Sequence, residues 1–278
     1  MHETLTVGFR HHQQGRLDEA ARLYQSVLAQ QPGDPDALHL LGVVALQQGD
    51  YRRAVDQLGQ AIARHPGRAL YHVNLAEAPR GLGHLDRAAE CCRTALRLEP
   101  RSAEAANCLG LVLLAEGRNE EAVVQFREAL RLKPDYGIAC NNLGNALRLS
   151  GDGDGAIAHF RRAAAIDAHL AEAHSNLGQL LLERRQSHEA LAHLQTAVRL
   201  RPNLPEARNN LGNALRGTGR LAEARQSYAE ALRINPSLAM TYNNMGQALQ
   251  EENALDDAMA WYQRAIDIEP GVARFHTR

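Results

Sequence analysis

The stretch Cys140–Asn145 reads Cys-Asn-Asn-Leu-Gly-Asn, and near-copies of it recur along the chain. Two of them are Arg208–Asn213, which reads Arg-Asn-Asn-Leu-Gly-Asn, and Tyr242–Gln247, which reads Tyr-Asn-Asn-Met-Gly-Gln. The glycines of these copies and of two looser ones are spaced 34 residues apart, at Gly110, Gly144, Gly178, Gly212 and Gly246. A fixed period of this length indicates a repeat array, in which each repeat packs mainly on its neighbours.

The same period divides the whole chain without any insertion or deletion. Extending it toward the N-terminus reaches Ala76, Gly42 and Gly8. We therefore predict a single repeat domain over 1–278, with eight repeats at 1–34, 35–68, 69–102, 103–136, 137–170, 171–204, 205–238 and 239–272. Residues 273–278 begin a ninth repeat and stop within it, so we expect the sequence to be cut from something longer.

Three kinds of residue recur at fixed places in the repeats. Alanine is invariant, at Ala20, Ala54, Ala88, Ala122, Ala156, Ala190, Ala224 and Ala258. Four residues later comes a larger side chain in most repeats: Tyr24, Leu58, Cys92, Phe126, Phe160, Leu194, Tyr228 and Tyr262. Proline closes seven repeats, at Pro32, Pro66, Pro100, Pro134, Pro202, Pro236 and Pro270.

Each repeat reads as two short helices. In the seventh, Ala207, Leu211 and Leu215 have helical spacing, Gly217–Gly219 interrupts it, and a second helix ends before Pro236. The period, the two-helix pattern and the recurring residues together resemble the tetratricopeptide repeat. That resemblance covers residues 1–272 and implies an all-α fold, a right-handed superhelical solenoid in which the first helix of each repeat lines a concave groove.

Two places depart from the repeat pattern. Pro79 falls inside a predicted first helix, where proline costs about 3 kcal/mol, so we expect that helix to bend or to end early. The fifth repeat has Gly-Asp-Gly-Asp-Gly at 151–155 in place of the usual turn and Ala168 in place of proline. The spacing of these aspartates does not match a helix–loop–helix calcium site, so we interpret the segment as a flexible turn and a soft point of the array.

The composition narrows the classes of function. A formal net charge of -1 gives no electrostatic reason to expect nucleic acid or an anionic membrane as a partner. No stretch is long and apolar enough to span a membrane, and the first residues do not read as a secretory signal. Four cysteines at Cys91, Cys92, Cys108 and Cys140 are too few and too irregular for a disulfide framework, and Cys92 is expected to serve as a core residue. We therefore expect a cytoplasmic protein.

Asparagines gather at the places that line the groove in the tetratricopeptide family. The predicted peptide-binding residues are Asn107, Asn141, Asn142, Asn145, Arg148, Asn176, Gln179, Asn209, Asn210, Asn213, Arg216, Asn243, Asn244 and Gln247. An amide offers both a donor and an acceptor, so stacked amides can hold a peptide backbone without reading its side chains. The arrangement resembles the asparagine ladder of the O-linked N-acetylglucosamine transferase repeats, with Asn142, Asn176, Asn210 and Asn244 as consecutive rungs. The alternative is that these asparagines serve the fold itself.

Other chemistry finds little support in the sequence. Arginine alternates with leucine along the predicted groove, at Arg80, Arg148 and Arg216, which suggests ion pairs with a bound segment. The lysines needed to clamp a C-terminal carboxylate are missing. His159 and His193 occupy equivalent places and are expected to lie near each other, while His72 and His174 read as packed histidines. We find no metal set, no catalytic motif and no cofactor motif, and predict that the chain is not an enzyme.

These features favour a protein-interaction scaffold that binds an extended peptide or partner segment in its groove. Bacterial chains that look like this one, with repeats of the type at Leu38–Gly42, often continue into a glycosyltransferase or sulfotransferase domain. The second hypothesis is therefore the non-catalytic N-terminal region of such an enzyme. A third is an array that associates end to end through its uncapped C-terminal repeat.

Overall fold

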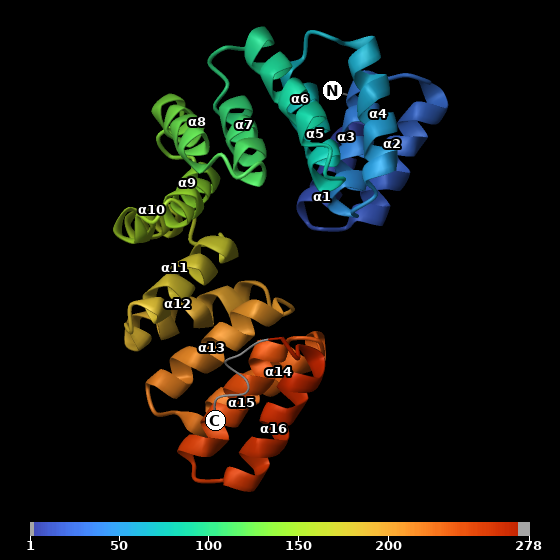
Figure 1. Ribbon diagram of the computed structural model, residues 1–278. Helices are drawn as coiled ribbons and strands as arrows, with labels where there is room; N and C mark the ends of the chain where they lie inside the picture. The colour runs from blue at the N-terminus through green and yellow to red at the C-terminus, as the bar shows by residue number, and fades with distance from the viewer. Residues whose placement is uncertain (1–2, 272–278) are drawn as a thin grey trace. The chain divides into compact units, whose positions relative to one another are not determined.

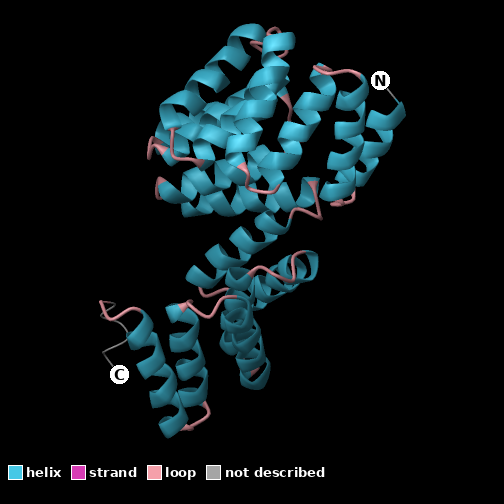
Figure 2. Ribbon diagram, turned by 90° about the vertical axis from the view of Figure 1, so that its right-hand side faces the viewer, coloured by secondary structure: helices cyan, strands magenta, loops and turns pink. Residues whose placement is uncertain are grey.

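The computed structural model describes residues 3–271, and all regular structure in that range is helical (Figures 1 and 2). Its contacts divide the chain into two units, which we call the N-terminal unit, Met1–Ser150, and the C-terminal unit, Gly151–Arg278. The N-terminal unit contains α1 (Glu3–Gln13), α2 (Leu17–Gln30), α3 (Pro35–Gln47), α4 (Tyr51–Arg64), α5 (Ala69–Gly81), α6 (Leu85–Leu98), α7 (Ala103–Ala115), α8 (Asn119–Leu132) and α9 (Gly137–Leu149). The C-terminal unit contains α10 (Gly153–Ile166), α11 (Ala171–Glu183), α12 (Ser187–Leu200), α13 (Pro205–Gly217), α14 (Leu221–Ile234), α15 (Ala239–Glu251) and α16 (Leu255–Ile268).

Every predicted repeat supplies one odd-numbered and one even-numbered helix. In the N-terminal unit, α3 packs on α4, α4 packs on α5, and α5 also contacts α7 directly. The C-terminal unit repeats this pattern, since α13 packs on α14, α14 packs on α15, and α13 contacts α15. Odd-numbered helices of successive repeats therefore lie side by side within each unit. The prediction of an all-α array of helix–turn–helix repeats is confirmed.

The recurring small residues lie where helices cross. The invariant alanines from Ala20 to Ala224 are fully buried, and Ala258 is almost so. Gly212 faces Tyr228 so closely that a Cβ atom added to it would lie 2.3 Å from the tyrosine ring, and one added to Gly110 would lie 2.6 Å from the ring of Phe126. Glycine therefore occupies a helix crossing that has no room for a side chain.

Of the two outcomes predicted for Pro79, an early end of helix α5 is wrong. The helix runs through Pro79 to Gly81 and has 13 residues, as α3 and α7 do. Proline removes its own N–H donor, and its ring crowds the carbonyl four residues earlier. Pro79 lies in the last turn of α5, and the hydrogen bond from Leu82 N to the Ala78 carbonyl after it is kept at 3.0 Å.

The glycine-rich segment 151–155 of the fifth repeat was expected to form a turn over its whole length, and this expectation is wrong. Only its first residues form the turn, because α10 already begins at Gly153. Asp152 caps that helix, with its carboxylate accepting a hydrogen bond from Gly155 N at 2.8 Å. Asp154 instead forms an ion pair with Arg184 at 2.9 Å. The division between the two units falls at this turn.

Two further expectations concern the ends of helices and of the chain. Helix α10 ends at Ile166 although its repeat has no closing proline, so proline is not required to end a second helix. The start of a ninth repeat, predicted at 273–278, lies outside the described residues. Within residues 3–271, no helix is long and apolar enough to cross a membrane.

Candidate peptide-binding groove

The predicted groove residues all lie on odd-numbered helices. In the N-terminal unit, Asn107 is on α7, whereas Asn141, Asn142, Asn145 and Arg148 are on α9. In the C-terminal unit, helix α11 contains Asn176 and Gln179. Helix α13 contains Asn209, Asn210, Asn213 and Arg216, and helix α15 contains Asn243, Asn244 and Gln247. The four proposed rungs are thus divided between the two units, with Asn142 in the first and the other three in the second.

Several of these amides join neighbouring repeats. Asn142 on α9 donates through Nδ2 to Oδ1 of Asn107 on α7 at 2.9 Å, and both side chains are buried. Asn244 donates to Asn209 in the same way, also at 2.9 Å. In each pair the two residues are 35 positions apart in the sequence. Asn107, Asn142 and Asn244 are buried and Asn209 is half-buried. Because buried amides need partners, these hydrogen bonds give the four residues a structural role.

The same inter-repeat hydrogen bond occurs once with a histidine. His39 on α3 and Asn74 on α5 are also 35 positions apart, and their side-chain nitrogens lie 2.7 Å from each other. His39 stacks on Tyr71, with ring centroids 4.5 Å apart. Burial lowers the pKa of His39 to about 4, which keeps the ring neutral at neutral pH. A neutral imidazole nitrogen can accept the hydrogen bond that the asparagine amide donates.

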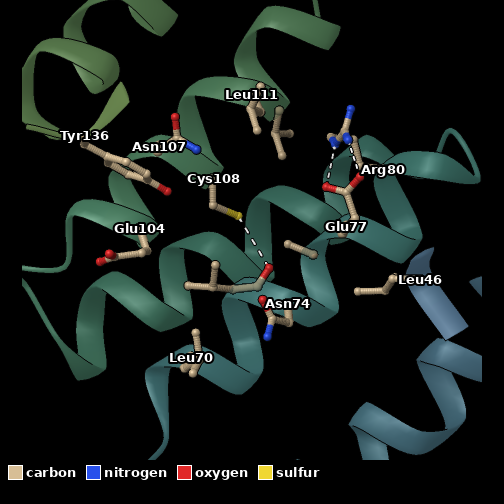
Figure 3. A pocket seen from close by; sticks show the side chains of 13 residues that line it. Leu46, Leu70, Asn74, Glu77, Arg80, Glu104, Asn107, Cys108, Leu111 and Tyr136 are labelled. Carbon is tan, nitrogen blue, oxygen red and sulfur yellow. Dashed lines mark hydrogen bonds and ion pairs between the residues drawn. The ribbon is translucent and has the colours of Figure 1, made fainter. Parts of the chain in front are cut away.

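A concave pocket of about 250 Å³ lies within the N-terminal unit (Figure 3). We call it the N-terminal groove. It lies between α5 and α7, with α3 at one end, and is lined by Leu46, Leu70, Val73, Asn74, Ala76, Glu77, Arg80, Glu104, Asn107, Cys108, Leu111, Val112 and Tyr136. Its lining is mostly apolar, and Leu70 is 47% exposed at the rim. Such a pocket suits an apolar side chain of a partner.

Charged pairs lie at opposite ends of this groove. At one end, Glu77 pairs with Arg80, whose Nε is 3.3 Å from the carboxylate. At the other end, Glu104 pairs with Lys133 at 3.1 Å, and the lysine ammonium lies 4.8 Å from the centre of the Tyr136 ring. Burial and the nearby Glu104 raise the pKa of the Tyr136 hydroxyl, so it stays protonated and able to donate. The charges cancel in pairs, which leaves a groove of low net charge.

The alternating arginines do not share one environment. Arg80 is paired with Glu77, and Arg216 on α13 pairs with Glu251 on α15 at 3.1 Å. Arg216 and Asn213 line a shallow depression of about 590 Å³ in the C-terminal unit, together with Glu183 and Glu251. Asn213 also accepts a hydrogen bond from Tyr228 at 2.8 Å. Two of the three arginines are therefore already neutralised inside their own unit.

The four cysteines were expected not to form a disulfide framework, and one pair of them is nevertheless joined. Cys92 on α6 and Cys108 on α7 are joined by a disulfide, with Cα atoms 5.9 Å apart, whereas Cys91 and Cys140 are free. Sequence spacing alone could not show this, because the two residues belong to different repeats and meet only when the repeats stack. Cys92 is nevertheless fully buried, as a core residue was expected to be.

Two histidines of neighbouring helices are in contact. His193 on α12 lies against His174 on α11, with their Nδ1 atoms 3.0 Å apart. Burial lowers the pKa of both rings. His174 is buried, as the prediction of a packed histidine requires. Among the described residues, no group of histidine, cysteine or carboxylate side chains is placed to hold a metal ion.

Of the predicted peptide-binding residues, Asn107 lines the N-terminal groove, and so does Arg80, the first of the alternating arginines. Amides dominate that prediction, whereas the lining of this groove is mostly apolar. The repeat position was the better signal, since Leu70, Glu77 and Arg80 occupy groove-lining places of the third repeat. Tyr136 lies outside those places, in the loop before α9, and only the fold brings it to the groove.

Stacked two-helix repeats and a groove along their first helices define a helical-repeat protein of the interaction-scaffold class. Residues 1–210 match the family described as Cilia and flagella-associated protein 70 C-terminal domain, and residues 203–269 match the one described as Tetratricopeptide repeat. The chain belongs to the tetratricopeptide repeat family.

Curated relatives match a part of the chain. Small glutamine-rich tetratricopeptide repeat-containing protein 2 of Mycosarcoma maydis is 31% identical over 86 residues, which is 31% of this chain and 24% of that protein. The protein of the same name from Saccharomyces cerevisiae (strain ATCC 204508 / S288c) is 29% identical over 90 residues, or 32% of this chain and 26% of that protein. The matches thus span about a quarter of the relatives' length.

Solved structures share the fold over more of the chain. The anaphase-promoting-complex assembly Cut9–Hcn1 aligns with a TM-score of 0.78 and 15% identity, covering 94% of this chain and 51% of that one. YrrB, described as a tetratricopeptide repeat protein with an unusual peptide-binding site, aligns with a TM-score of 0.59 and 26% identity, covering 67% of this chain and 96% of its own. Pseudomonas aeruginosa PilF aligns with a TM-score of 0.68 and 20% identity, covering 77% of this chain and 97% of its own.

Proposed function

We propose that the chain is a non-catalytic scaffold that binds an extended peptide segment of a partner protein, with the N-terminal groove as its main site. The observation that carries this proposal is the apolar pocket between α5 and α7, with a charged pair at each end. A small pocket of this kind holds one or two side chains of a peptide and leaves the rest of it in contact with neighbouring repeats.

The groove chemistry favours a particular kind of peptide. Val73, Leu111 and Val112 offer apolar contact to an aliphatic side chain. Asn107 uses its oxygen to accept from Asn142, so its amino group is the part of this amide that remains to donate to a peptide carbonyl. Because the charges are paired, we propose a ligand with an apolar anchor and no large net charge, and neither nucleic acid nor a membrane as partner.

The amide ladder remains a second part of this proposal. Asn142 and Asn244 each use one donor for a neighbouring repeat and retain a carbonyl oxygen that can accept from a peptide N–H. The likeness to YrrB, whose description includes a peptide-binding site, supports a peptide ligand in general.

Three finer hypotheses accompany the proposal. We propose a cytoplasmic location in a bacterium, and we retain the hypothesis that these repeats form the N-terminal region of a larger glycosyltransferase or sulfotransferase. End-to-end self-association remains the third, and a sedimentation mass equal to one chain over a range of concentrations would exclude it.

A pair of matched leucines tests the groove. Leu70 on α5 lines the groove and is 47% exposed, whereas Leu98 at the end of α6 is 43% exposed and does not line it. Both belong to the third repeat, and both tolerate charge for the fold because they are exposed. We expect Leu70→Glu to lower capture from a displayed peptide library at least about tenfold, since a buried unpaired charge opposes binding, and Leu98→Glu to bind like the wild type. Equal capture by the wild type and Leu70→Glu would contradict the proposal.

The ladder needs a separate variant that leaves the fold intact. Asn142→Ala would remove an inter-repeat hydrogen bond together with any contact to a peptide, so loss of binding could follow from loss of structure. Asn145, one turn further along α9, is half-buried and has no hydrogen bond to another side chain among residues 3–271. Asn145→Ala should weaken capture with an unchanged thermal midpoint, and unaltered capture would remove Asn145 from the ladder.

A further inference from the structure

The third repeat departs from its neighbours at two facing places. Where Gly110 faces the ring of Phe126 in the fourth repeat, the third repeat has Ala76 and the much smaller Cys92. A cysteine cannot fill the volume of a phenylalanine or tyrosine ring. In this structure, the sulfur of Cys108 from the next repeat bonds to Cys92. Ala76, Cys92 and Cys108 belong to one buried cluster.

The disulfide lies where other repeats are joined by an amide. His39 with Asn74 and Asn107 with Asn142 show the usual pairing, 35 positions apart. Between the third and fourth repeats, the equivalent residues are Val73 and Cys108, also 35 positions apart. The valine side chain has no hydrogen-bonding atom, so no bond between the two side chains forms there, and the Cys108 sulfur instead lies 3.9 Å from the backbone carbonyl oxygen of Val73. The covalent bond from Cys108 to Cys92 holds α7 to the preceding repeat instead.

Both cysteines of the disulfide are buried, but they differ in their relation to the groove. Cys92 is fully buried, whereas Cys108 is 9% exposed and lines the N-terminal groove (Figure 3). A reagent from solvent therefore reaches the disulfide at Cys108, through the groove. Cys91, next to Cys92, is a free thiol of intermediate burial. Burial raises its pKa, so it remains protonated and is a poor nucleophile toward the adjacent bond.

We propose that Cys92 and Cys108 form a thiol–disulfide site that controls the order of the N-terminal groove; its effect on ligand binding rests on the function proposed above. In the oxidised form the bond fixes α7 against α6 and so fixes one wall of the groove. In the reduced form that wall is held by packing alone.

The exchange uses a low-molecular-weight thiol such as glutathione. Its thiolate attacks the Cys108 sulfur, the bond to Cys92 breaks, and the electron pair leaves with the Cys92 sulfur, which takes up a proton. A second reagent thiolate attacks the reagent sulfur of the mixed disulfide, so that the bond to Cys108 breaks, the oxidised reagent leaves, and the Cys108 thiolate takes up a proton. Two electrons pass from two reagent thiols to the protein disulfide. Glutathione disulfide reverses both steps.

The full chain tests this in two redox states of one polypeptide. Protein equilibrated with glutathione disulfide or with dithiothreitol is denatured, alkylated with iodoacetamide and weighed. We expect two alkyl groups in the oxidised state, on Cys91 and Cys140, and four in the reduced state. Amide hydrogen exchange of the native protein should be at least about tenfold faster in α5–α7 after reduction, with little change in α1–α2.

Two variants serve as controls. Cys140→Ala removes a free cysteine of α9 and should keep the difference between the redox states, whereas Cys108→Asn should abolish it. Four alkyl groups after oxidation, or equal exchange in both states, would overturn the redox site. Reduction should also lower peptide capture at least about threefold, because a preordered groove binds better. If the two states capture peptide equally, the disulfide does not control binding, although the redox site itself stands. If neither state captures peptide while the difference in hydrogen exchange persists, the proposed peptide-binding function is wrong instead.

Discussion

The crossing of Gly110 with Phe126 allows a prediction in which one substitution changes sign with its background. In Gly110→Ala, the new Cβ atom would lie 2.6, 2.8 and 2.9 Å from three atoms of the Phe126 ring. That ring is fully buried and cannot swing away. Overpacking of this kind costs about 1–3 kcal/mol, and three close contacts argue for the upper half of that range. Alanine regains about 1 kcal/mol of helix propensity. We expect a net loss of about 1–2 kcal/mol in the free energy of unfolding.

The background variant Phe126→Ala removes the clashing ring. It costs about 3–5 kcal/mol by itself because it opens a cavity. Within that background, Gly110→Ala meets no ring and should stabilise the protein by about 1 kcal/mol through helix propensity. Gly59→Ala on α4 is the matched control, since nothing lies within 4 Å of its added Cβ atom, and it should stabilise the wild type by about 0.5–1 kcal/mol.

Urea unfolding followed by circular dichroism measures all five proteins, with the transition midpoint as the readout. If Gly110→Ala shifts the midpoint by the same amount and sign with and without Phe126, the helix crossing is not what selects glycine. If Gly59→Ala is as destabilising as Gly110→Ala, then a general effect of alanine explains both results, and the reasoning from the close contact fails.

Three other perturbations have defined outcomes. Asn142→Ala leaves the buried oxygen of Asn107 without its donor and should lower the free energy of unfolding by about 1–3 kcal/mol, a loss that urea unfolding would detect. Asp152→Ala removes the cap of α10 and should cost about 1 kcal/mol, whereas Asp154→Ala should cost less because its ion pair is exposed; equal losses would contradict the capping role. Burial lowers the pKa of His39 from 6.5 to about 4, so the unfolded chain binds a proton first as pH falls. As the pH falls from 6.5 to 4, the wild type should therefore lose on the order of 3 kcal/mol of unfolding free energy relative to His39→Gln. Unfolding curves recorded across that pH range measure this difference.

The helices were predictable because their signal is repeated eight times. Pro79 makes the helix of one repeat ambiguous, but the other seven repeats have the same pattern without it. The structure has a helix of the usual length there as well. Local exceptions were harder to predict. The middle residue of the turn between the two helices of each repeat has positive φ and is usually glycine, but Arg185 and Asn253 adopt the same conformation at φ values of 58° and 62°. Asparagine adopts this backbone more readily than most residues, whereas at Arg185 the neighbouring helices impose a backbone that arginine does not favour.

The candidate site was harder to predict than the fold. Asparagines at the groove positions suggested a ligand, and the structure shows that four of them form hydrogen bonds with one another between neighbouring repeats. Nothing in a single repeat distinguishes these roles, because the partner amide lies 35 positions away. The disulfide between Cys92 and Cys108 escaped prediction for the same reason: it depends on how one repeat stacks on the next.

The hydrogen bonds between successive repeats also limit how the array can be rearranged. Excising 103–136 would leave the 34-residue period intact, yet it would place Val73 where Asn107 now accepts from Asn142. Excising 69–102 would instead place His39 opposite Cys108 and remove Cys92, the disulfide partner of that cysteine. Each repeat is therefore matched to its particular neighbours. Shuffled or shortened arrays should keep these residue pairs together rather than only preserve the repeat length.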